Sequence, residues 1–317
     1  MSSKMSSNNE IMHPQEFSLA NWWQIAKRVM LKVEQDNMSL IAAGVAFYFL
    51  LAVFPLLAAL VSMYGLFTDQ QTLLQHMSLL VGVIPEQSRE ILEAQIESLL
   101  ATDNSALSVG FVFSFLLAIW SGGKGSVALI TACNISYKEG ETRSFFKMII
   151  VRTMLTLATI LTMLLMLLMI VIIPFALSML DETSQSLLSW VTWPILLILF
   201  NLSLASLYKY APHRASAKWH WTTPGAVLAT LFWLVGSYFF NLYITEYASY
   251  NETYGSMGGV VILLMWFYVT AFTILLGAAI NAAAELQTEE DTTTGEEKPK
   301  GKRGAYVANN GPSDLKQ

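Results

Sequence analysis

Charged residues are scarce in this sequence. Asp, Glu, Lys and Arg make up 13% of the 317 residues, whereas hydrophobic residues make up 54%. A soluble domain carries roughly 25% charged residues, so this chain has too little polar surface to cover a globule of its length in water. Because the apolar residues also occur in long blocks, the composition excludes an ordinary soluble domain and predicts a membrane protein.

The residue patterns of several enzyme classes are also missing. The single cysteine, Cys133, excludes an intramolecular disulfide framework. The chain has no P-loop, no Gly-rich dinucleotide fingerprint and no HExxH motif, and its four histidines are scattered. No serine or cysteine nucleophile stands with a recognisable base. We therefore expect no enzymatic activity, no metal site and no cofactor.

The sequence does contain six apolar segments, each near or above the roughly 20 residues that a helix needs to cross a bilayer. They predict an all-α, polytopic membrane protein with spans at about 38–63, 106–133, 148–179, 187–208, 224–244 and 256–280. We expect Pro224 at the first helical position of the fifth span, where its missing N–H costs nothing.

The spans define a membrane domain at 38–287, which includes an extracytoplasmic loop at 64–104. In the N-terminal segment 1–37, an amphipathic pattern predicts a helix at 16–33. Two placements are open for it: in the membrane interface, or packed on the inner face of the protein. The loop carries a second amphipathic pattern and predicts two short surface helices, which lie on the membrane or across the mouth of the bundle. The charged segment 288–317 lacks apolar periodicity, so we expect a disordered cytoplasmic tail.

Basic residues predict the orientation of the chain. All Lys and Arg except Lys124 and Arg89 lie in the segments 1–38, 134–152, 209–221 and 287–317. These segments alternate with the opposite loops, and basic loops are retained in the cytoplasm. We therefore expect both termini in the cytoplasm. The net charge of −5 sums two faces and a tail and predicts no nucleic-acid partner.

Lys124 is the strongest single site candidate, because it interrupts the second span. A charged group at membrane depth costs at least about 2.5–3.5 kcal/mol and usually faces a cavity or a partner. Gly122, Gly123 and Gly125 weaken the helix beside it, and glycine-interrupted membrane helices often flank binding sites. Two interpretations are open: Lys124 faces a polar cavity, or its ammonium snorkels toward the head groups.

The last span offers Lys124 a partner. Asn281 and Glu285 stand four residues apart, so they share one helix face at the cytoplasmic end. Asn134 lies at comparable depth at the end of the second span. If these two spans are neighbours, all four side chains form a polar cluster that lines a cavity or a substrate site. The alternative is that Asn281 bonds a neighbouring helix and Glu285 is solvated.

Two weaker patterns concern the ends of the bundle. Pro55, Pro174 and Pro194 fall on the outer halves of their spans, and three bends at similar depth predict an external cavity. Proline is also simply common in membrane helices. The basic and aromatic segment 208–221 suits a boundary of anionic head groups, or it serves only to set topology.

Four stretches, taken together, resemble the YihY/BrkB family of bacterial inner-membrane proteins: 42–57, 120–147, 207–233 and 251–285. The residues that match family motifs are Gly123, Lys124, Asn134, Tyr137, Tyr254, Gly255, Ser256, Leu276, Gly277, Ala278 and Asn281. The resemblance implies an inner-membrane location, and it carries suggestions of envelope or lipid transport and serum resistance. Some family members carried a ribonuclease label, which the missing metal cluster argues against.

Two functions follow as expectations. The first is a transporter or flippase-like protein for an anionic lipid or lipid-linked envelope precursor. The second is a non-transporting scaffold that anchors envelope-assembly machinery through the loop at 69–103. Membrane lipids are the expected partners in the first case, and envelope-assembly proteins in the second. Small-residue patches fit packing within the chain and dimerisation equally well, so the oligomeric state is open.

Overall fold

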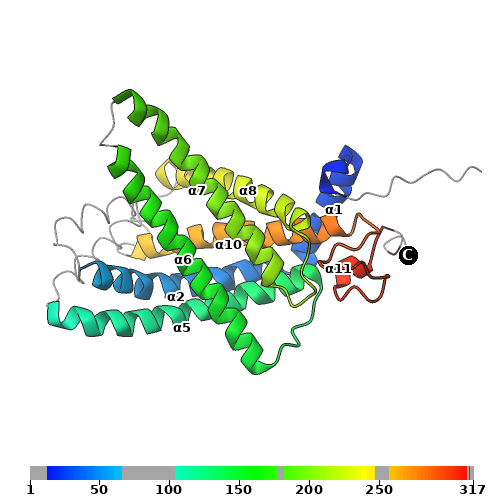
Figure 1. Ribbon diagram of the computed structural model, residues 1–317, viewed down its shortest axis with the longest axis horizontal. Helices are drawn as coiled ribbons and strands as arrows, with labels where there is room; N and C mark the ends of the chain where they lie inside the picture. The colour runs from blue at the N-terminus through cyan, green and yellow to red at the C-terminus, as the bar shows by residue number, and fades with distance from the viewer. Residues whose placement is uncertain (1–12, 66–103, 178–181, 247–256, 313, 315–317) are drawn as a thin grey trace, which may run out of the picture.

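The computed structural model describes residues 13–65, 104–177, 182–246, 257–312 and 314. These residues are almost entirely helical (Figure 1). The elements are η1 (Pro14–Glu16), α1 (Leu19–Gln35), α2 (Met38–Gly65), α5 (Asn104–Tyr137), α6 (Phe145–Leu177), α7 (Glu182–Tyr210), α8 (Trp219–Glu246), α10 (Gly258–Glu285) and α11 (Tyr306–Asn309). Ala217 and Thr293 form an isolated antiparallel bridge, and the described residues contain no strand.

Six of these helices, α2, α5, α6, α7, α8 and α10, are long and apolar enough to cross a membrane. Each predicted span overlaps one of them, which confirms the expectation of an all-α protein with six candidate spans. Helices α2, α5 and α10 run side by side along the long axis of the molecule, whereas α6 and α7 lie obliquely across them (Figure 1).

Helix α1, the interhelical loops 138–144 and 211–218, and residues 286–312 gather at one end of the bundle (Figure 1). We call this the basic end. The predicted loop helices lie outside the described residues. Pro55, Pro174 and Pro194 lie within α2, α6 and α7, but the described residues do not test the external cavity that was expected from bends at these prolines. Those expectations, and the division of the chain at 37 and 287, stay predictions.

Small residues bring α2 and α5 together. Ala42, Ala43, Gly44 and Ala46 form a patch of small residues near the start of α2. Ala42 and Ala46 are fully buried, whereas Ala43 and Gly44 are exposed. A Cβ added at Gly125 would lie 3.5 Å from the Phe49 ring, in ordinary contact. The patch therefore serves at least in part for packing within the chain, since close approach of backbones is what small residues allow in membrane helices.

The fifth span begins earlier than predicted, at Trp219, so Pro224 lies inside α8. A proline within a helix removes one backbone hydrogen bond and displaces others. The side chain of Asn281 in α10 binds the backbone on both sides of this proline: its Oδ1 accepts from the Gly225 N–H at 2.7 Å, and its Nδ2 donates to the Thr222 carbonyl at 2.9 Å. An amide from a neighbouring helix thus braces the first turns of α8, which sequence position alone does not indicate.

Helix α1 packs on the bundle with one face and leaves its other face exposed. Its placement in the membrane interface stays a prediction. Ser18 caps its N-terminus by accepting from the Asn21 N–H. Ile25 and Val29 are buried where α1 packs against α10 and α2. On the other side, Trp23 and Leu31 are exposed, as suits an amphipathic helix beside lipid head groups.

The expectation of a disordered tail was wrong for residues 288–312, which are folded on the basic end. Val307 and Ala308 are buried, and so is Arg303, whose guanidinium donates to the backbone carbonyls of Glu289, Glu290, Lys298 and Ala308. Hydrogen bonds of this kind hold the segment together. They leave no hydrophobic periodicity in the sequence, which is why the pattern indicated disorder.

Candidate functional site

A buried ion pair lies at the centre of the basic end. The Arg214 guanidinium, in the α7–α8 loop, donates to both carboxylate oxygens of Glu285, the last residue of α10, at 3.0 and 2.7 Å. These side chains are 1% and 0% exposed. The guanidinium carbon lies 4.8 Å from the centroid of the Tyr137 ring, and Thr292 Oγ1 donates to Glu285 at 2.6 Å. Four segments of the chain therefore meet at one pair of charges.

This geometry holds Arg214 in its charged form. Burial by itself lowers the pKa of the guanidinium, because desolvation penalises the charged state. The attraction and hydrogen bonds of Glu285 outweigh burial, so the pKa of Arg214 lies above its ordinary value. A bidentate arginine–carboxylate pair is strong and directional. Arg214 is thus committed to holding its loop against α10.

The two predicted asparagines also lie at or near the basic end, and both are engaged by the protein. Asn134 Oδ1 accepts from the His213 N–H at 2.7 Å, and its Nδ2 donates to Glu141 at 2.9 Å. Asn134 therefore ties the α5–α6 loop to the α7–α8 loop, while Asn281 braces the first turns of α8. Of the predicted cluster, the structure brings Asn134, Asn281 and Glu285 to this region, with structural partners for each.

Lys124 does not join this cluster. Its side chain is exposed on the outside of α5, with the ammonium 5.9 Å from the centroid of the Trp120 ring, itself 62% exposed. The expected pairing of Lys124 with Glu285 was wrong, because Arg214 takes that place. Sequence spacing relates residues within one helix, but the rotation of α5 about its axis decides which of them face the bundle.

The three glycines beside Lys124 differ in their surroundings. A Cβ at Gly122 would lie 3.1 Å from Thr156 Cγ2 of α6, next to the hydrogen bond between Ser126 Oγ and Thr156 Oγ1 at 2.8 Å. Gly125 faces α2, and a Cβ at Gly123 would meet open space. Gly122 and Gly125 thus allow the close approach of neighbouring helices. Their contacts give no indication of a ligand.

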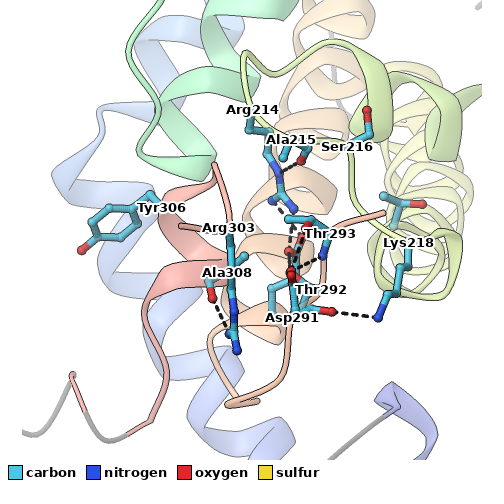
Figure 2. A network of polar contacts seen from close by, with 12 residues as sticks. Arg214, Ala215, Ser216, Lys218, Asp291, Thr292, Thr293, Arg303, Tyr306 and Ala308 are labelled. Carbon is cyan, nitrogen blue, oxygen red and sulfur yellow. Dashed lines mark hydrogen bonds and ion pairs between the residues drawn. The ribbon is translucent and has the colours of Figure 1, made fainter. Parts of the chain in front are cut away.

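The folded tail closes over the ion pair through a network of polar contacts (Figure 2). Lys218 binds it twice: its backbone N–H donates to the Thr292 carbonyl at 2.9 Å and its ammonium to the Asp291 carbonyl at 2.8 Å. Asp291 Oδ1 accepts from the Thr293 N–H and hydroxyl at 2.9 and 2.7 Å. The tail is therefore built onto the α7–α8 loop.

Acid is expected to loosen this tail. Burial raises the pKa of Asp291, but hydrogen bonds from Thr293 and Lys298 outweigh it and set the pKa below the ordinary 3.8. A lowered folded-state pKa stabilises the fold fully above about 3.8, and this stabilisation is lost as pH falls through the lower value. Hydrogen exchange of residues 288–312, corrected for the intrinsic pH effect, should therefore accelerate in that acid range.

Asp291→Asn provides the control for this experiment. Its tail should exchange faster than wild type already at pH 6, because the amide is a weaker acceptor for the same donors. Lowering the pH should then cause little further acceleration of exchange through position 291, because the amide does not titrate. Equal protection of both proteins at pH 6 would contradict the assigned role of Asp291.

A basic pocket of about 400 Å³ lies beside the ion pair, between the start of α6 and the end of α7. None of the described residues that line it is acidic. The lining residues are Arg143, Lys147, Val151, Lys209, Tyr210, Pro212, His213, Arg214, Ala215, Ser216 and Gly304. Sequence reasoning placed Lys209 in a segment suited to anionic head groups but missed Arg143 and Lys147. Their positive charge was visible, but their convergence depends on how α6 and α7 pack.

A second cavity, of about 730 Å³, lies between η1 and α8, and its lining includes Trp22, Pro224 and Leu228. The rings of His13 and His220 meet there edge to face, with centroids 4.8 Å apart. Within the described ranges, no three His, Cys, Asp or Glu side chains converge in the manner of a metal site.

Comparison with known proteins points to one family. The profile of the family described as Virulence factor BrkB matches residues 29–302. A Bacillus subtilis (strain 168) protein named "Putative ribonuclease-like protein YfkH" is 30% identical over 76% of this chain and 88% of its own. A UPF0761 membrane protein of Psychromonas ingrahamii is 25% identical over 85% of this chain and 91% of its own. No solved structure matches.

Proposed function

The chain belongs to the BrkB family of membrane proteins, and from that premise we propose that it moves an anionic lipid or a lipid-linked envelope precursor in the bacterial inner membrane. The observation that carries this proposal is the basic pocket. Basic pockets between membrane helices on the cytoplasmic side are suited to anionic head groups. The pocket lies at the ends of two candidate spans, where head groups would be.

The surroundings of the pocket support contact with lipid. Phe145 and Phe146, at the first turn of α6, are strongly exposed, as is Tyr210 at the end of α7. Exposed aromatic rings at helix ends are typical of the membrane–water interface. A lipid head group could therefore enter the pocket sideways while its acyl chains stay beside α6 and α7.

The proposed orientation places the basic end, and with it both termini, in the cytoplasm. It rests on the uneven distribution of Lys and Arg between the two sides of the predicted topology. A reporter active only in the cytoplasm, fused after residue 317, should be active, whereas a reporter that requires the opposite compartment should be silent. The reverse result would remove the pocket from the cytoplasmic leaflet.

Reconstitution tests the transport function. Vesicles of phosphatidylethanolamine and phosphatidylglycerol would carry fluorescent phosphatidic acid in both leaflets, and a membrane-impermeant quencher would report the inner leaflet as it becomes accessible. We expect the protein to accelerate that exchange over protein-free vesicles. A Lys147→Ala/Lys209→Ala variant should lose most of the acceleration, and Lys27→Ala, at the same end but outside the pocket, should keep it.

Lys124→Ala belongs in the same assay. Because Lys124 faces away from the polar cluster, this variant should move lipid at the wild-type rate if the pocket is the main determinant. Wild-type exchange no faster than in empty vesicles would instead favour the scaffold function. That alternative was expected to use residues 69–103, which lie outside the described ranges. The basic pocket is the feature that supports lipid handling.

A further inference from the structure

We propose that Lys209 and Lys147 bind the phosphate group of an anionic lipid within the basic pocket, while Arg143 and Arg214 form its fixed frame. This inference deepens the proposed function and rests on it for the lipid source of the phosphate. It assigns a ligand class and separate roles to four basic side chains that line one cavity.

The surroundings of Lys209 are the main reason for this assignment. Its side chain belongs to a residue only 7% exposed. The ammonium lies 4.3 Å from the centroid of the Trp219 ring and 5.6 Å from that of Tyr210. Among the described residues, no carboxylate lies within ion-pair distance of it. A buried cation is ordinarily paired, and aromatic faces offset its charge only in part. The geometry therefore leaves Lys209 able to accept an anion in the pocket.

Lys147 supplies the second charge from a different helix. It stands one turn before Val151 on α6, and both residues line the pocket, as spacing by four on a helix allows. Lys147 is exposed and forms no ion pair with a described carboxylate. An ammonium group on a flexible stem adapts to a tetrahedral phosphate, which does not require the planar fork of arginine.

The two arginines are already engaged. Arg143 donates to the carbonyls of Ala211 and Pro212 at 3.1 and 2.8 Å and to Glu141 at 3.2 Å. Arg214 is paired with Glu285. These bonds shape the α7–α8 loop that forms one edge of the pocket, and both guanidinium charges are already paired with carboxylates, those of Glu141 and Glu285. Two uncommitted ammonium groups then match the charge of one phosphate monoester.

The folded tail forms the remaining part of the wall of the basic pocket. Gly304 lines the pocket, and its carbonyl accepts from the Ala215 N–H at 2.9 Å. The volume of about 400 Å³ accommodates a phosphate with part of its glycerol or sugar. The same chemistry also suits a soluble phosphate compound. Exposed Tyr210, which lines the pocket, and exposed Phe145 and Phe146, next to Lys147 in the chain, favour a lipid. Binding experiments separate the two sources.

Equilibrium binding to the purified full-length protein in nanodiscs tests the assignment, with short-chain phosphatidic acid, short-chain phosphatidylcholine and inorganic phosphate as probes. Phosphatidic acid should bind most tightly and lose affinity as salt rises. Lys209→Gln should weaken its binding about tenfold or more, and Lys147→Gln several-fold, as expected for losing a charge-assisted contact. Lys209→Arg should retain most of the affinity.

Lys27→Gln is the matched control, because Lys27 also lies over a tryptophan, 5.2 Å from the Trp23 ring centroid, but outside the pocket. Its affinity should equal that of wild type. Unchanged phosphatidic acid binding in the Lys147→Gln/Lys209→Gln variant, with an unaltered melting temperature, would overturn the site while leaving lipid exchange in vesicles a separate question. Lysine-dependent binding of inorganic phosphate without lipid binding would overturn the lipid assignment.

Discussion

Replacing Arg214 by leucine is expected to destabilise the protein by about 3–5 kcal/mol, because Glu285 would be left as a buried carboxylate without its partner. The Glu285 side chain is fully buried, and Arg214 donates to both of its oxygens. Thr292 would supply the one remaining side-chain hydrogen bond that we find for it. Thermal unfolding in detergent, followed by the loss of monodisperse protein, measures the change.

The double variant Arg214→Leu/Glu285→Leu is the decisive control. Replacing both partners of a buried ion pair by apolar residues is often neutral or even stabilising. The double variant should therefore be more stable than Arg214→Leu alone, although it loses the contacts of Thr292 and Tyr137. If the single variant melts at the wild-type temperature, the pair is not buried as the structure places it.

The second large effect is expected at the crossing of α8 and α10. A Cβ at Gly225 would strike the carbonyl oxygen of Gly277 and would lie 2.5 Å from Cγ of Asn281. Both atoms belong to a packed backbone or to a side chain held by two hydrogen bonds, so neither can easily move. Gly225→Ala should cost about 2 kcal/mol or more, since overpacking typically costs 1–3 kcal/mol, despite the better helix propensity of alanine.

Gly277→Ala should behave in the same way. Its Cβ would meet the Tyr208 hydroxyl and would lie 2.7 Å from both Ala229 Cβ and the Gly225 carbonyl oxygen. The matched control is Gly123→Ala, where the added methyl meets open space. That variant should be neutral or stabilised by up to about 1 kcal/mol through helix propensity. Equal melting temperatures for all three variants would argue against a close α8–α10 crossing.

The candidate site shows how far local pattern reasoning extends. Spacing by four correctly put Asn281 and Glu285 on one face of α10, because helix geometry alone decides which residues share a face. The same reasoning assigned Lys124 as their partner, although two helices can be neighbours without turning a chosen residue toward each other. Arg214, from a loop of no regular period, takes that role.

The basic pocket illustrates the same limit. Lys147, Lys209 and Arg143 come from segments about 60 residues apart in sequence, and each was counted as a charge that sets topology. Their sites become one feature only when α6 and α7 pack against each other. The folded tail was missed for a related reason, since buried hydrogen bonds such as those of Arg303 and Asp291 leave no hydrophobic period.

The sequence by itself determined the membrane class, the six apolar helices and the family resemblance. Hydropathy and motif order are properties of the chain that survive any arrangement of its helices. Only the tertiary structure decided that Glu285 pairs with Arg214, that Lys124 faces outward, and that residues 286–312 fold over the basic end. Those outcomes depend on helix rotation and loop path, which are set by contacts between residues distant in the chain.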